Sequence, residues 1–428
     1  MGIEANSATR LSSPAPKQRG RLFELARPAL RAARAVLFRL AYAYFSASVK
    51  MDPTAVCMLS DTRLDSSGNL LPIRDALVGT PMRAVIVDKP SKAHRRSVGE
   101  SLGVLRTLAG CKYVLLEDHS PLVHEITPRA GQVIVQTWHA SGAFKKIGHS
   151  RLTSGKSPGR IFHRNYTYAI VGGEANRAPY AEGFGMPVER VLATGLPRTD
   201  RFANASDAAE TGARILGEHP EIVGKRVVLF APTFRGMNSL DAYYDWDRLD
   251  FDALAEALGD GCVVLIKPHP YVAYNMANKP RFAASRALLE SAMARHPGVF
   301  LDFSTFPDVN DLLFVADVLV TDYSSIIFEH SLVAKPVVYF AYDYDEYLAD
   351  RGFYFDFAEY TYGPVVRTSA QLAAALLSAE VDEANLATFR ERFTGACDGH
   401  AAERFVTTFF AEELATPVSR TPRGVSTF

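Results

Sequence analysis

The chain has 428 residues, of which 48% are hydrophobic and 22% are charged. This length exceeds one compact core and predicts two domains of ordinary size with extensions, and the composition excludes a chain that is mainly disordered. Residues 1–50 carry nine Lys or Arg and two Asp or Glu, so a basic arm precedes a body with seven more acidic than basic residues, and such an arm favours a polyanionic surface as partner.

The basic arm divides into two parts. Residues 1–20 are rich in Ser, Pro, Ala and Arg, which predicts a disordered segment. Residues 21–50 are predicted to form a basic amphipathic helix. Its apolar face, which repeats at three- and four-residue spacing, consists of Leu30, Ala33, Leu37, Leu40 and Tyr44.

The uncharged run in this helix is too short to cross a membrane. Its longest uncharged run, from Leu40 to Val49, is half of the roughly 20 residues that span a bilayer. A helix lying on an anionic membrane fits the pattern better, with arginines at the headgroups and apolar side chains below them. The alternative is a helix that packs on the body and exposes its arginines to water. Nucleic acid is not expected as a partner, because the composition of the body gives no basic face.

The four cysteines lie far apart and form no CxxC pair or zinc-binding spacing. This pattern is typical of reduced thiols in a cytoplasmic protein. With the basic helix, it predicts a peripheral protein on the cytoplasmic face of the cell membrane. No metal or other cofactor is predicted, because the DxD patterns at 245–247 and 343–345 lie in acidic, Tyr-rich stretches where they arise by chance.

Short apolar, β-branched runs alternate with helical stretches through the body. Several are continuous apolar runs bounded by turn residues, as is typical of strands buried on both faces of a parallel sheet. The predicted strands are residues 82–88, 112–117, 132–136, 167–171, 190–194, 226–230, 262–267, 317–321 and 336–340. The alternation predicts an α/β fold with two doubly wound, Rossmann-like domains that face each other across a cleft.

The domain boundary is predicted near residues 203–212, which lack large apolar side chains. It separates an N-terminal α/β domain at 51–205 from a C-terminal α/β domain at 206–415. Residues 416–428 are predicted to be a loose tail. Ligands of such sheets bind at the carboxyl ends of the strands, so polar residues directly after the strands are the candidates for a site.

The strand at 317–321 leads into a candidate phosphate site. Asp322 begins the turn, and Ser324 or Ser325 can cap the helix that follows. Free backbone N–H groups and the positive end of the helix dipole suit a phosphate there, whereas a plain N-cap needs no ligand. Glu329 on this helix is placed either to accept hydrogen bonds from ribose hydroxyls or to face solvent.

Two further strand ends carry histidines. Lys267 supplies positive charge and His269 can donate hydrogen bonds to phosphate oxygens, or both belong to an exposed turn with incidental charge. His139 is placed to act as a general base, because histidine titrates near physiological pH. A lone histidine is more often structural, but small residues and the pair Lys145-Lys146 follow this one, which favours a function.

Arginines follow other strands. Arg198 and Arg235 each lie just after a predicted strand, and a guanidinium suits bidentate contact with phosphate. Arg351 is a third candidate, or part of a surface loop. Arg198, Lys145 and Arg351 are therefore interpreted as possible phosphate contacts.

Seven motifs occur in one order: QTWHASGAFKKIG, TGLPRTDRF, FAPTFRG, IKPHP, TDYSSIIFEHSLVAKPVVYF, YDYDEY and RGFYFDF. From about residue 60 to 362 they resemble the CDP-glycerol glycerophosphotransferase family of teichoic acid synthesis, which includes glycerol-phosphate primases and polymerases. The resemblance implies a glycosyltransferase-B fold, with the donor held mainly by the C-terminal domain and the acceptor on the N-terminal side. It also implies attack of an acceptor hydroxyl on the β-phosphorus of CDP-glycerol, with release of CMP.

The resemblance assigns roles by motif position. His139 corresponds to the catalytic base, and His269 to the essential histidine near the donor phosphates. Ser324 and Ser325 match the serines that hold the pyrophosphate. The family's membrane-associating basic region corresponds to residues 21–50.

The chain departs from the family pattern at three places. Ala140 stands where the family usually has Gly, and Ser141-Gly142 where it has Thr-Pro. Glu329-His330 stand where it commonly has Asp-Phe. The base is retained, so these departures concern the acceptor and the polyol more than the class of reaction.

We therefore expect an enzyme that moves glycerol phosphate, or a related polyol phosphate, from a CDP-linked donor to a hydroxyl of a wall polymer or lipid-linked acceptor. Its predicted catalytic residues are His139 and His269, and its predicted donor-binding residues are Arg235, Lys267, Asp322, Ser324, Ser325 and Glu329. One alternative is a nucleotide-sugar glycosyltransferase of the same fold, which releases a nucleotide diphosphate. A non-catalytic, membrane-peripheral binding protein of a wall-polymer complex is the other.

Overall fold

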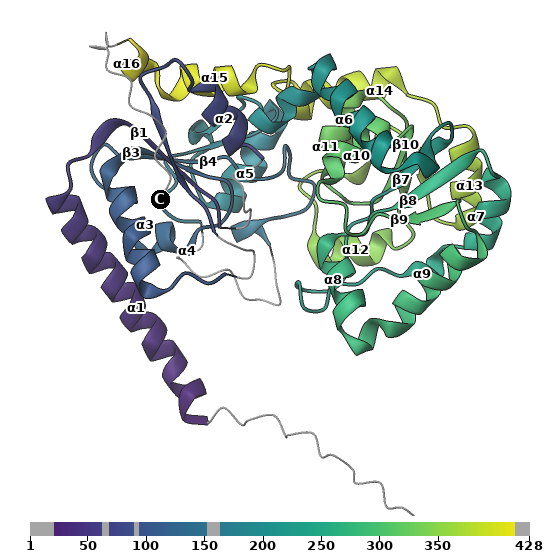
Figure 1. Cartoon of the computed structure of the whole chain (residues 1–428), viewed down its shortest axis with the longest axis horizontal. Helices are drawn as coiled ribbons and strands as arrows, with labels where there is room; N and C mark the ends of the chain where they lie inside the picture. Colours follow the sequence, from purple (N-terminus) through teal and green to yellow (C-terminus); the bar gives the residue numbers. More distant parts are fainter. Residues whose placement is uncertain (1–20, 62–67, 90–93, 152–162, 416–428) are drawn as a thin grey trace, which may run out of the picture.

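The computed structural model of the chain describes residues 21–61, 68–89, 94–151 and 163–415. The arm predicted at 1–20 and the tail predicted at 416–428 lie outside these residues. Within them, two parallel six-stranded sheets lie side by side, and helices cover both (Figure 1). The predicted α/β class is confirmed, with one sheet at the centre of each domain.

The first sheet has the strand order β2-β1-β3-β4-β5-β6. Its strands are β1 (Asp52–Leu59), β2 (Arg83–Val87), β3 (Cys111–Leu116), β4 (Val133–Gln136), β5 (Tyr168–Ile170) and β6 (Val191–Leu192). Its helices include α2 (Leu70–Ala76), α3 (Val98–Gly110), α4 (Pro121–Glu125) and α5 (Arg177–Phe184). Strand β1 lies inside the sheet, with Val56 opposite Ala84 and Tyr113. It is absent from the predicted strands, because polar residues and a proline interrupt the apolar pattern at its start.

The second sheet has the strand order β12-β11-β10-β7-β8-β9. Its strands are β7 (Arg226–Phe230), β8 (Cys262–Ile266), β9 (Phe300–Asp302), β10 (Val318–Thr321), β11 (Val337–Phe340) and β12 (Val365–Val366). The chain runs outward from β7 to β9, then returns to the other side of β7 and continues to β12. The carboxyl ends of β7 and β10, where this reversal occurs, are where doubly wound sheets bind ligands.

Helices connect the strands of the second sheet. They are α6 (Ala205–Glu218), α7 (Phe251–Leu258), α8 (Pro270–Asn278), α9 (Ala283–Arg295), α10 (Val309–Val315), α11 (Ile326–Val333), α12 (Tyr344–Arg351), α13 (Ser369–Leu377) and α14 (Glu383–Phe389). Local sequence explains many helix starts: α13 begins with a capping box in which Thr368 accepts from the backbone of Gln371. The short strands β9 and β12 are absent from the predictions.

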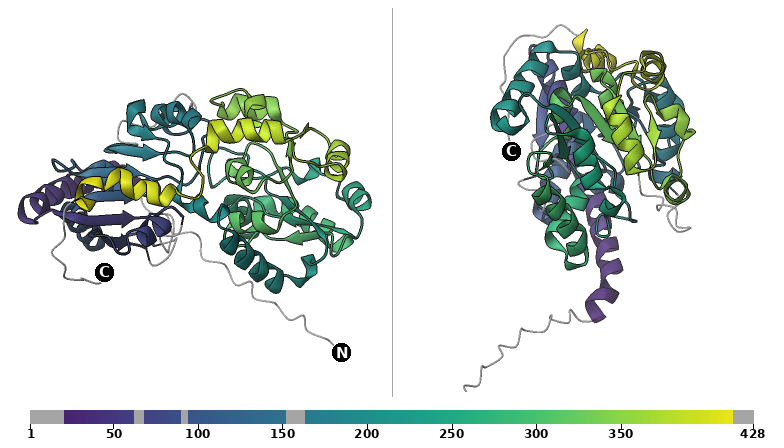
Figure 2. Two further views of the ribbon diagram at one scale, coloured as in Figure 1. Left: turned by 90° about the horizontal axis from the view of Figure 1, so that it is seen from above. Right: turned by 90° about the vertical axis from the view of Figure 1, so that its right-hand side faces the viewer.

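The C-terminal helices α15 (Ala401–Phe409) and α16 (Ala411–Leu414) return to the first sheet (Figure 2). Phe405 and Phe410 pack in one buried cluster with Val56 of β1. Glu413 accepts a hydrogen bond of 2.7 Å from the hydroxyl of Tyr113. The structure therefore differs from the predicted extent of the C-terminal domain, because the apolar pattern of a helix does not say which sheet it covers.

A loop of the first domain inserts into the second. It follows β4 and carries Phe144, whose ring stacks on Tyr360 with 4.3 Å between centroids. The hydroxyl of Tyr360 donates to the carbonyl of Ala143 at 2.8 Å. Phe144 is buried in one cluster with Tyr323 and Phe353 of the second domain. The two sheets are thus joined at their carboxyl ends.

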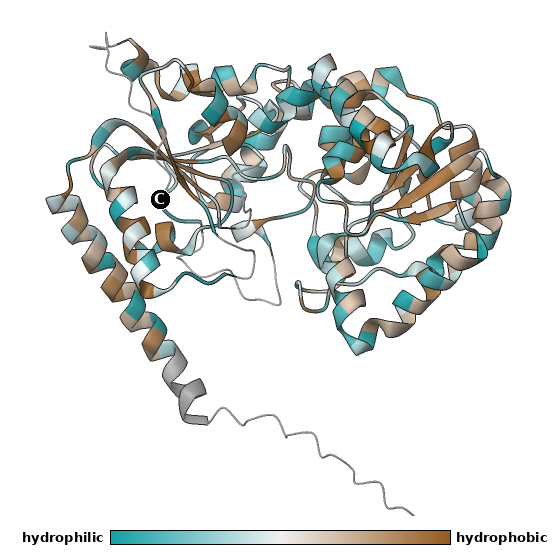
Figure 3. Ribbon diagram, in the orientation of Figure 1, coloured by the Kyte–Doolittle hydropathy of each residue, from teal (hydrophilic) through white to brown (hydrophobic). Residues whose placement is uncertain are grey.

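Helix α1 (Arg21–Ser48) packs on α3 and α4 through a different face from the predicted apolar one. Phe38 and Tyr42 are buried, and Tyr42 donates to Gln132 at 2.6 Å. The predicted face stays largely uncovered: Leu40 and Tyr44 are 65% and 67% exposed. Apolar residues run along the helix as it leaves the body (Figure 3). Among the described residues, no helix has the length and apolar content that crossing a bilayer requires.

Candidate active site

His139 is exposed and held in one orientation. It follows β4, and the neighbouring strand β3 ends at the same edge, which brings Asp118 beside it. The Nδ1 atom of His139 lies 2.5 Å from an Oδ1 of Asp118. Because a carboxylate only accepts hydrogen bonds, Nδ1 carries the proton and Nε2 keeps its lone pair. The His139 side chain is 46% exposed, so this nitrogen can take a proton from a bound hydroxyl.

The residue before His139 helps to fix the ring. Trp138 has a φ of 53°, which an L residue seldom adopts. Its indole stacks on the imidazole with 4.4 Å between centroids. Asn69 donates to the carbonyl of Trp138 at 2.7 Å and accepts from the backbone N–H of Arg198 at 3.1 Å. Through Asn69, the loop that carries His139 is therefore linked by hydrogen bonds to the backbone of Arg198.

His269 lies at the carboxyl end of the second sheet, just after β8. It precedes α8, and its Nδ1 accepts from the backbone N–H of Tyr271 at 3.2 Å, so Nε2 carries the proton. Burial, and then the charges of Lys145, Lys267 and His139, lower the pKa of His269 to about 3. The ring is thus a neutral hydrogen-bond donor at physiological pH.

Two lysines lie beside His269. Lys145, on the inserted loop, donates to Thr233 Oγ1 at 3.0 Å and to the hydroxyl of Tyr347 at 3.2 Å. Lys267 follows β8, is 5% exposed and donates to the carbonyl of Ser304 at 3.1 Å. Both acceptors of Lys145 are neutral oxygens, so its positive charge is available to a phosphate.

The start of α11 offers hydroxyl groups to a ligand. Ser324 Oγ accepts weakly from the backbone N–H of Ile326 at 3.4 Å. Ser325 occupies the N-cap position, but its side chain makes no cap hydrogen bond. Both serines are half-buried. The helix start therefore offers the hydroxyl groups of both serines to a ligand.

Arg235 and Asp322 form a buried pair. Asp322 accepts from Arg235 Nη1 at 2.6 Å and from the backbone N–H groups of Thr233 and Tyr323 at 2.8 and 2.7 Å. Arg235 Nε and Nη2 each donate to Asp343 at 2.7 Å. Arg235 is 6% exposed and Asp322 is fully buried. These contacts hold the ends of β7 and β10 together. Both side chains are therefore buried inside the second domain and are not part of its surface.

Arg351 is also engaged within the second domain. It is 6% exposed, donates to the carbonyl of Gly236, and lies over the ring of Phe234 at 5.2 Å. Its predicted contact with phosphate would require this arrangement to open.

Glu329 links the two domains. Its Oε1 accepts from Arg198 Nη2 at 2.5 Å and from Ser141 Oγ at 2.7 Å, and the residue is only 2% exposed. Arg198 and Ser141 belong to the first domain, whereas Glu329 lies on α11 of the second. Two of the residues that depart from the family pattern, Ser141 and Glu329, therefore contact each other.

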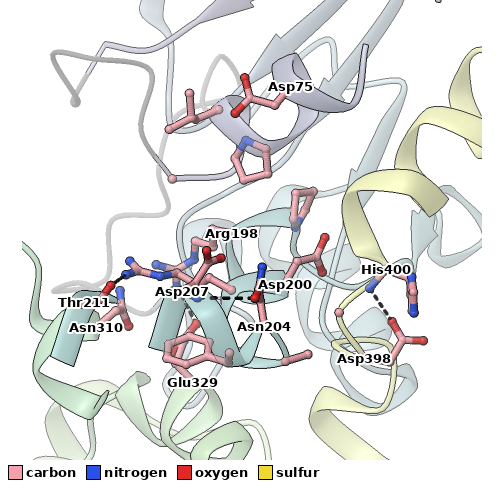
Figure 4. Close-up of a pocket in the computed structure, with 18 of the residues that line it drawn as sticks. Asp75, Arg198, Asp200, Asn204, Asp207, Thr211, Asn310, Glu329, Asp398 and His400 are labelled. Carbon is pink, nitrogen blue, oxygen red and sulfur yellow. Dashed lines mark hydrogen bonds and ion pairs between the residues drawn. The ribbon is translucent and has the colours of Figure 1, made fainter. Parts of the chain in front are cut away.

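Arg198 and Glu329 line a cavity of about 990 Å³ between the domains (Figure 4). Its other walls include α2, the start of α6 and the residues just before and within α10. The acidic residues in its lining are Asp75, Asp200, Asp207, Glu210, Asp308, Glu329 and Asp398. Because acidic residues dominate this lining, the cavity suits an uncharged group, while Lys145 and Lys267 supply positive charge outside it.

Sequence reasoning missed Asp118 and Asn69. Asp118 directly follows the strand predicted at 112–117, so the rule that selected the other candidates applies to it as well. Asn69 lies directly before α2, and no sequence signal marks it.

Three histidines are packed against the site and give a pH-dependent stability. His119, His124 and His163 have ring centroids 4.4 to 6.2 Å apart, and His163 contacts Trp138. Burial lowers the pKa of His124 and of His163 to about 3. Their folded-state pKa lies below the unfolded value of about 6.5, so the unfolded chain binds protons first as the pH falls.

We expect the free energy of unfolding to fall as the pH drops below about 6.5, by about 1.4 kcal/mol per pH unit for each of these two histidines. Urea unfolding at a series of pH values from 7.5 to 5 measures this. His163→Phe should reduce the slope, whereas His400→Asn, at an exposed position, should leave it unchanged. Equal slopes for all three proteins would contradict the assignment.

Comparisons with known proteins identify the family. A family model described as CDP-Glycerol:Poly(glycerophosphate) glycerophosphotransferase matches residues 50–411. The chain is 37% identical over 389 residues to the teichoic acid poly(ribitol-phosphate) polymerase of Bacillus spizizenii, covering 89% of this chain and 60% of that protein. It is 35% identical over 364 residues to the teichoic acid ribitol-phosphate polymerase TarK of Staphylococcus aureus, covering 83% and 68%.

A shorter relative and a solved structure agree. The teichoic acid ribitol-phosphate primase of Bacillus spizizenii is 31% identical over 313 residues, covering 71% of this chain and 76% of that protein. The structure of the wall teichoic acid polymerase TagF has a TM-score of 0.68 and 20% identity, and the match covers 91% of this chain and 98% of that one. This likeness shows the fold. The chain spans 60% of the length of the first relative, and it belongs to the CDP-glycerol:poly(glycerophosphate) glycerophosphotransferase family.

Proposed function

We propose that this chain transfers a polyol phosphate from a CDP-linked donor to a hydroxyl of a wall-polymer or lipid-linked acceptor, with release of CMP. One observation carries the proposal: His139 is exposed and oriented by Asp118 at 2.5 Å, and the neutral donor His269 follows the carboxyl end of β8 in the other domain. A general base and a phosphate-binding group are thus available on opposite sides of one opening. Membership of the family supports the same reaction.

We propose ribitol as the polyol. The ribitol-phosphate polymerases among the relatives are 33 to 37% identical to this chain. The glycerol-phosphate enzymes are 25 to 28% identical. Because the donor side differs from the common family pattern at Glu329, the higher likeness to the ribitol enzymes favours the longer polyol.

The proposed chemistry is a single displacement at phosphorus. The acceptor oxygen attacks the β-phosphorus, which carries the polyol, while His139 Nε2 takes the hydroxyl proton. The bond from this phosphorus to the bridging oxygen breaks, and CMP leaves with the electron pair. His269, Lys145 and Lys267 stabilise the negative charge that moves onto the departing phosphate.

The donor would lie along α11. Its diphosphate would meet Ser324 and Ser325 at the helix start, and its nucleoside would extend toward Glu329 and the cavity. Arg235 and Asp322 would act as positioning residues, because their hydrogen bonds are made within the second domain. Catalysis would then rest on orientation and electrostatics, as is general in phosphoryl transfer.

An assay of the released nucleotide tests the function. The full chain is incubated with CDP-ribitol, CDP-glycerol or nucleotide sugars, and with membranes as a source of acceptor. We expect CMP from CDP-ribitol at a rate about tenfold above that from CDP-glycerol, since a site built for hydroxyl groups discriminates against their loss. Release of a nucleotide diphosphate from a sugar donor would favour a glycosyltransferase. No release from any donor would favour a non-catalytic binding protein.

We further propose that α1 docks on the cytoplasmic face of the membrane. The residues Leu37, Leu40 and Tyr44 are 43%, 65% and 67% exposed, so they make an apolar stripe that the body leaves largely uncovered, and arginines flank it. Since α1 packs through Phe38 and Tyr42, the helix can stay attached to the protein while this stripe enters the lipid.

Binding to vesicles checks this proposal. Leu37→Glu with Leu40→Glu should lower binding to anionic vesicles by about tenfold or more. The reason is that two negative charges replace apolar side chains that would otherwise enter the lipid. The matched control is Leu216→Glu with Leu377→Glu, which are 39% and 59% exposed on α6 and α13. Flotation of the full chain with phosphatidylglycerol vesicles measures binding, and equal losses for the two pairs would refute the role of α1.

A further inference from the structure

A second exposed apolar surface lies on the second domain. It is formed by a loop after β7 and by one face of α8. Leu240 is 67% exposed, Tyr274 is 62% exposed, and Tyr271 and Met237 are 46% and 39% exposed. Single exposed apolar residues need no explanation, but a group of large ones held together points to a partner. With Lys279 and Arg281, these four residues are here named the donor-domain rim.

Hydrogen bonds hold the rim in one piece. The side-chain amide of Asn275, on α8, donates to the carbonyls of Ser239 at 3.0 Å and Ala242 at 2.8 Å. Lys279 and Arg281 both donate to the carbonyl of Leu240. The loop is therefore fastened to α8, and Leu240 stays exposed beside two cations.

The rim is basic on an acidic body. Residues 270–296 contain four Lys or Arg and one Glu, whereas residues 51–428 have an excess of acidic residues. Among the residues that the structure describes, neither Lys279 nor Arg281 has a carboxylate within ion-pair distance. The nearby Asp241 turns its carboxylate onto the backbone N–H groups of Met237 and Asn238. Exposed Leu, Met and Tyr next to two cations that form no direct ion pair among the described residues match the chemistry of an anionic lipid surface.

The rim adjoins the candidate active site. The ring of Tyr271 lies 4.9 Å from that of His269, and Phe234 contacts both rings. In Figure 1 and in the right view of Figure 2, α8 lies on the lower side of the body, which is the side toward which α1 extends. Helix α8 of the rim and the end of α1 that leaves the body therefore lie on the same side of the molecule.

We propose that the donor-domain rim is a second membrane contact, which docks on an anionic bilayer together with α1. Two contacts, one on each domain, orient the molecule, whereas α1 alone would leave it free to tilt. The mouth of the opening near His269 is then held at the lipid surface. The membrane contact itself does not depend on the proposed function. Its benefit does, because the orientation helps only if a lipid-linked acceptor has to reach the site from the bilayer.

The test uses the full chain with Leu240→Glu and Tyr274→Glu, and the Leu216→Glu with Leu377→Glu protein as control. Flotation with vesicles of phosphatidylcholine and phosphatidylglycerol measures binding. We expect the rim variant to bind about tenfold more weakly and the control to bind as the unchanged chain does. Lys279→Gln with Arg281→Gln should reduce the difference between anionic vesicles and vesicles of phosphatidylcholine alone.

A second readout separates this inference from the proposed function. CMP release with a water-soluble polyol-phosphate oligomer as acceptor should be the same for the rim variant and the unchanged chain. Equal vesicle binding by all variants would overturn the inference, and so would a parallel loss of activity on the soluble acceptor. If the unchanged chain releases no CMP, the proposed function fails, while vesicle binding still decides whether the rim is a membrane contact.

Discussion

Replacing His139 with alanine is expected to lower the rate of CMP release from the CDP-polyol by about 10²–10⁴. The substitution removes the only group placed to take the proton from the acceptor hydroxyl among the residues described near the opening. Donor binding should change little, because the groups proposed to bind the diphosphate, such as His269 and Lys267, remain. Single-turnover release of CMP measures the chemical step, and donor affinity is measured separately by titration calorimetry.

Two variants sharpen this prediction. Asp118→Asn keeps the shape of the pair but no longer favours the orientation with the proton on Nδ1, so the rate should fall and its dependence on pH should change. His296→Ala alters a histidine that pairs with Asp252 and is absent from the cavity lining, so it should leave the rate unchanged. Near-normal turnover by His139→Ala would remove the base from the proposed mechanism.

Replacing Asp322 with alanine is expected to lower the free energy of unfolding of the second domain by about 3–5 kcal/mol. Asp322 is fully buried and satisfies Arg235 and the backbone N–H groups of Thr233 and Tyr323. Without it, those two N–H groups are left unpaired and the buried guanidinium keeps only Asp343 as a charged partner. Urea unfolding followed by circular dichroism measures the loss.

The matched control is Asp345→Ala. Asp345 is 83% exposed and lies 3.8 Å from Arg367, so its removal should cost less than about 0.5 kcal/mol. If Asp322→Ala were as stable as this control while donor binding was lost, Asp322 would contact the donor directly, as the sequence suggested, and its structural role would be wrong.

The strand-end rule explains why much of the site could be predicted. His139, Lys267, Ser324 and Ser325 each follow a strand whose continuous apolar run is legible in the sequence. Parallel strands end at one edge of a sheet, so residues in these positions gather wherever the sheet lies. Asp118 follows the same rule. It was missed because the residues around it form no recognisable motif.

Other features depend on partners that are distant in sequence. In the sequence, Arg235 and Asp322 have the positions expected of donor-binding residues. In the structure, Asp343 pairs with the guanidinium of Arg235, and both Arg235 and Asp322 are buried. Glu329 meets Ser141 and Arg198 only because a loop of one domain inserts into the other.

The amino-acid sequence by itself determined the α/β class, the positions of most strands, the family and the residues at the strand ends, because these follow from local periodicity and from motifs within short segments. Only the tertiary structure decided that α15 and α16 cover the first sheet, that α1 packs through Phe38 and Tyr42, and that Arg235 is a buried support. The physical reason is that burial and charge pairing depend on which surfaces meet in the folded chain. An apolar or charged pattern in the sequence indicates that a face needs a partner, but it does not indicate which segment that partner is.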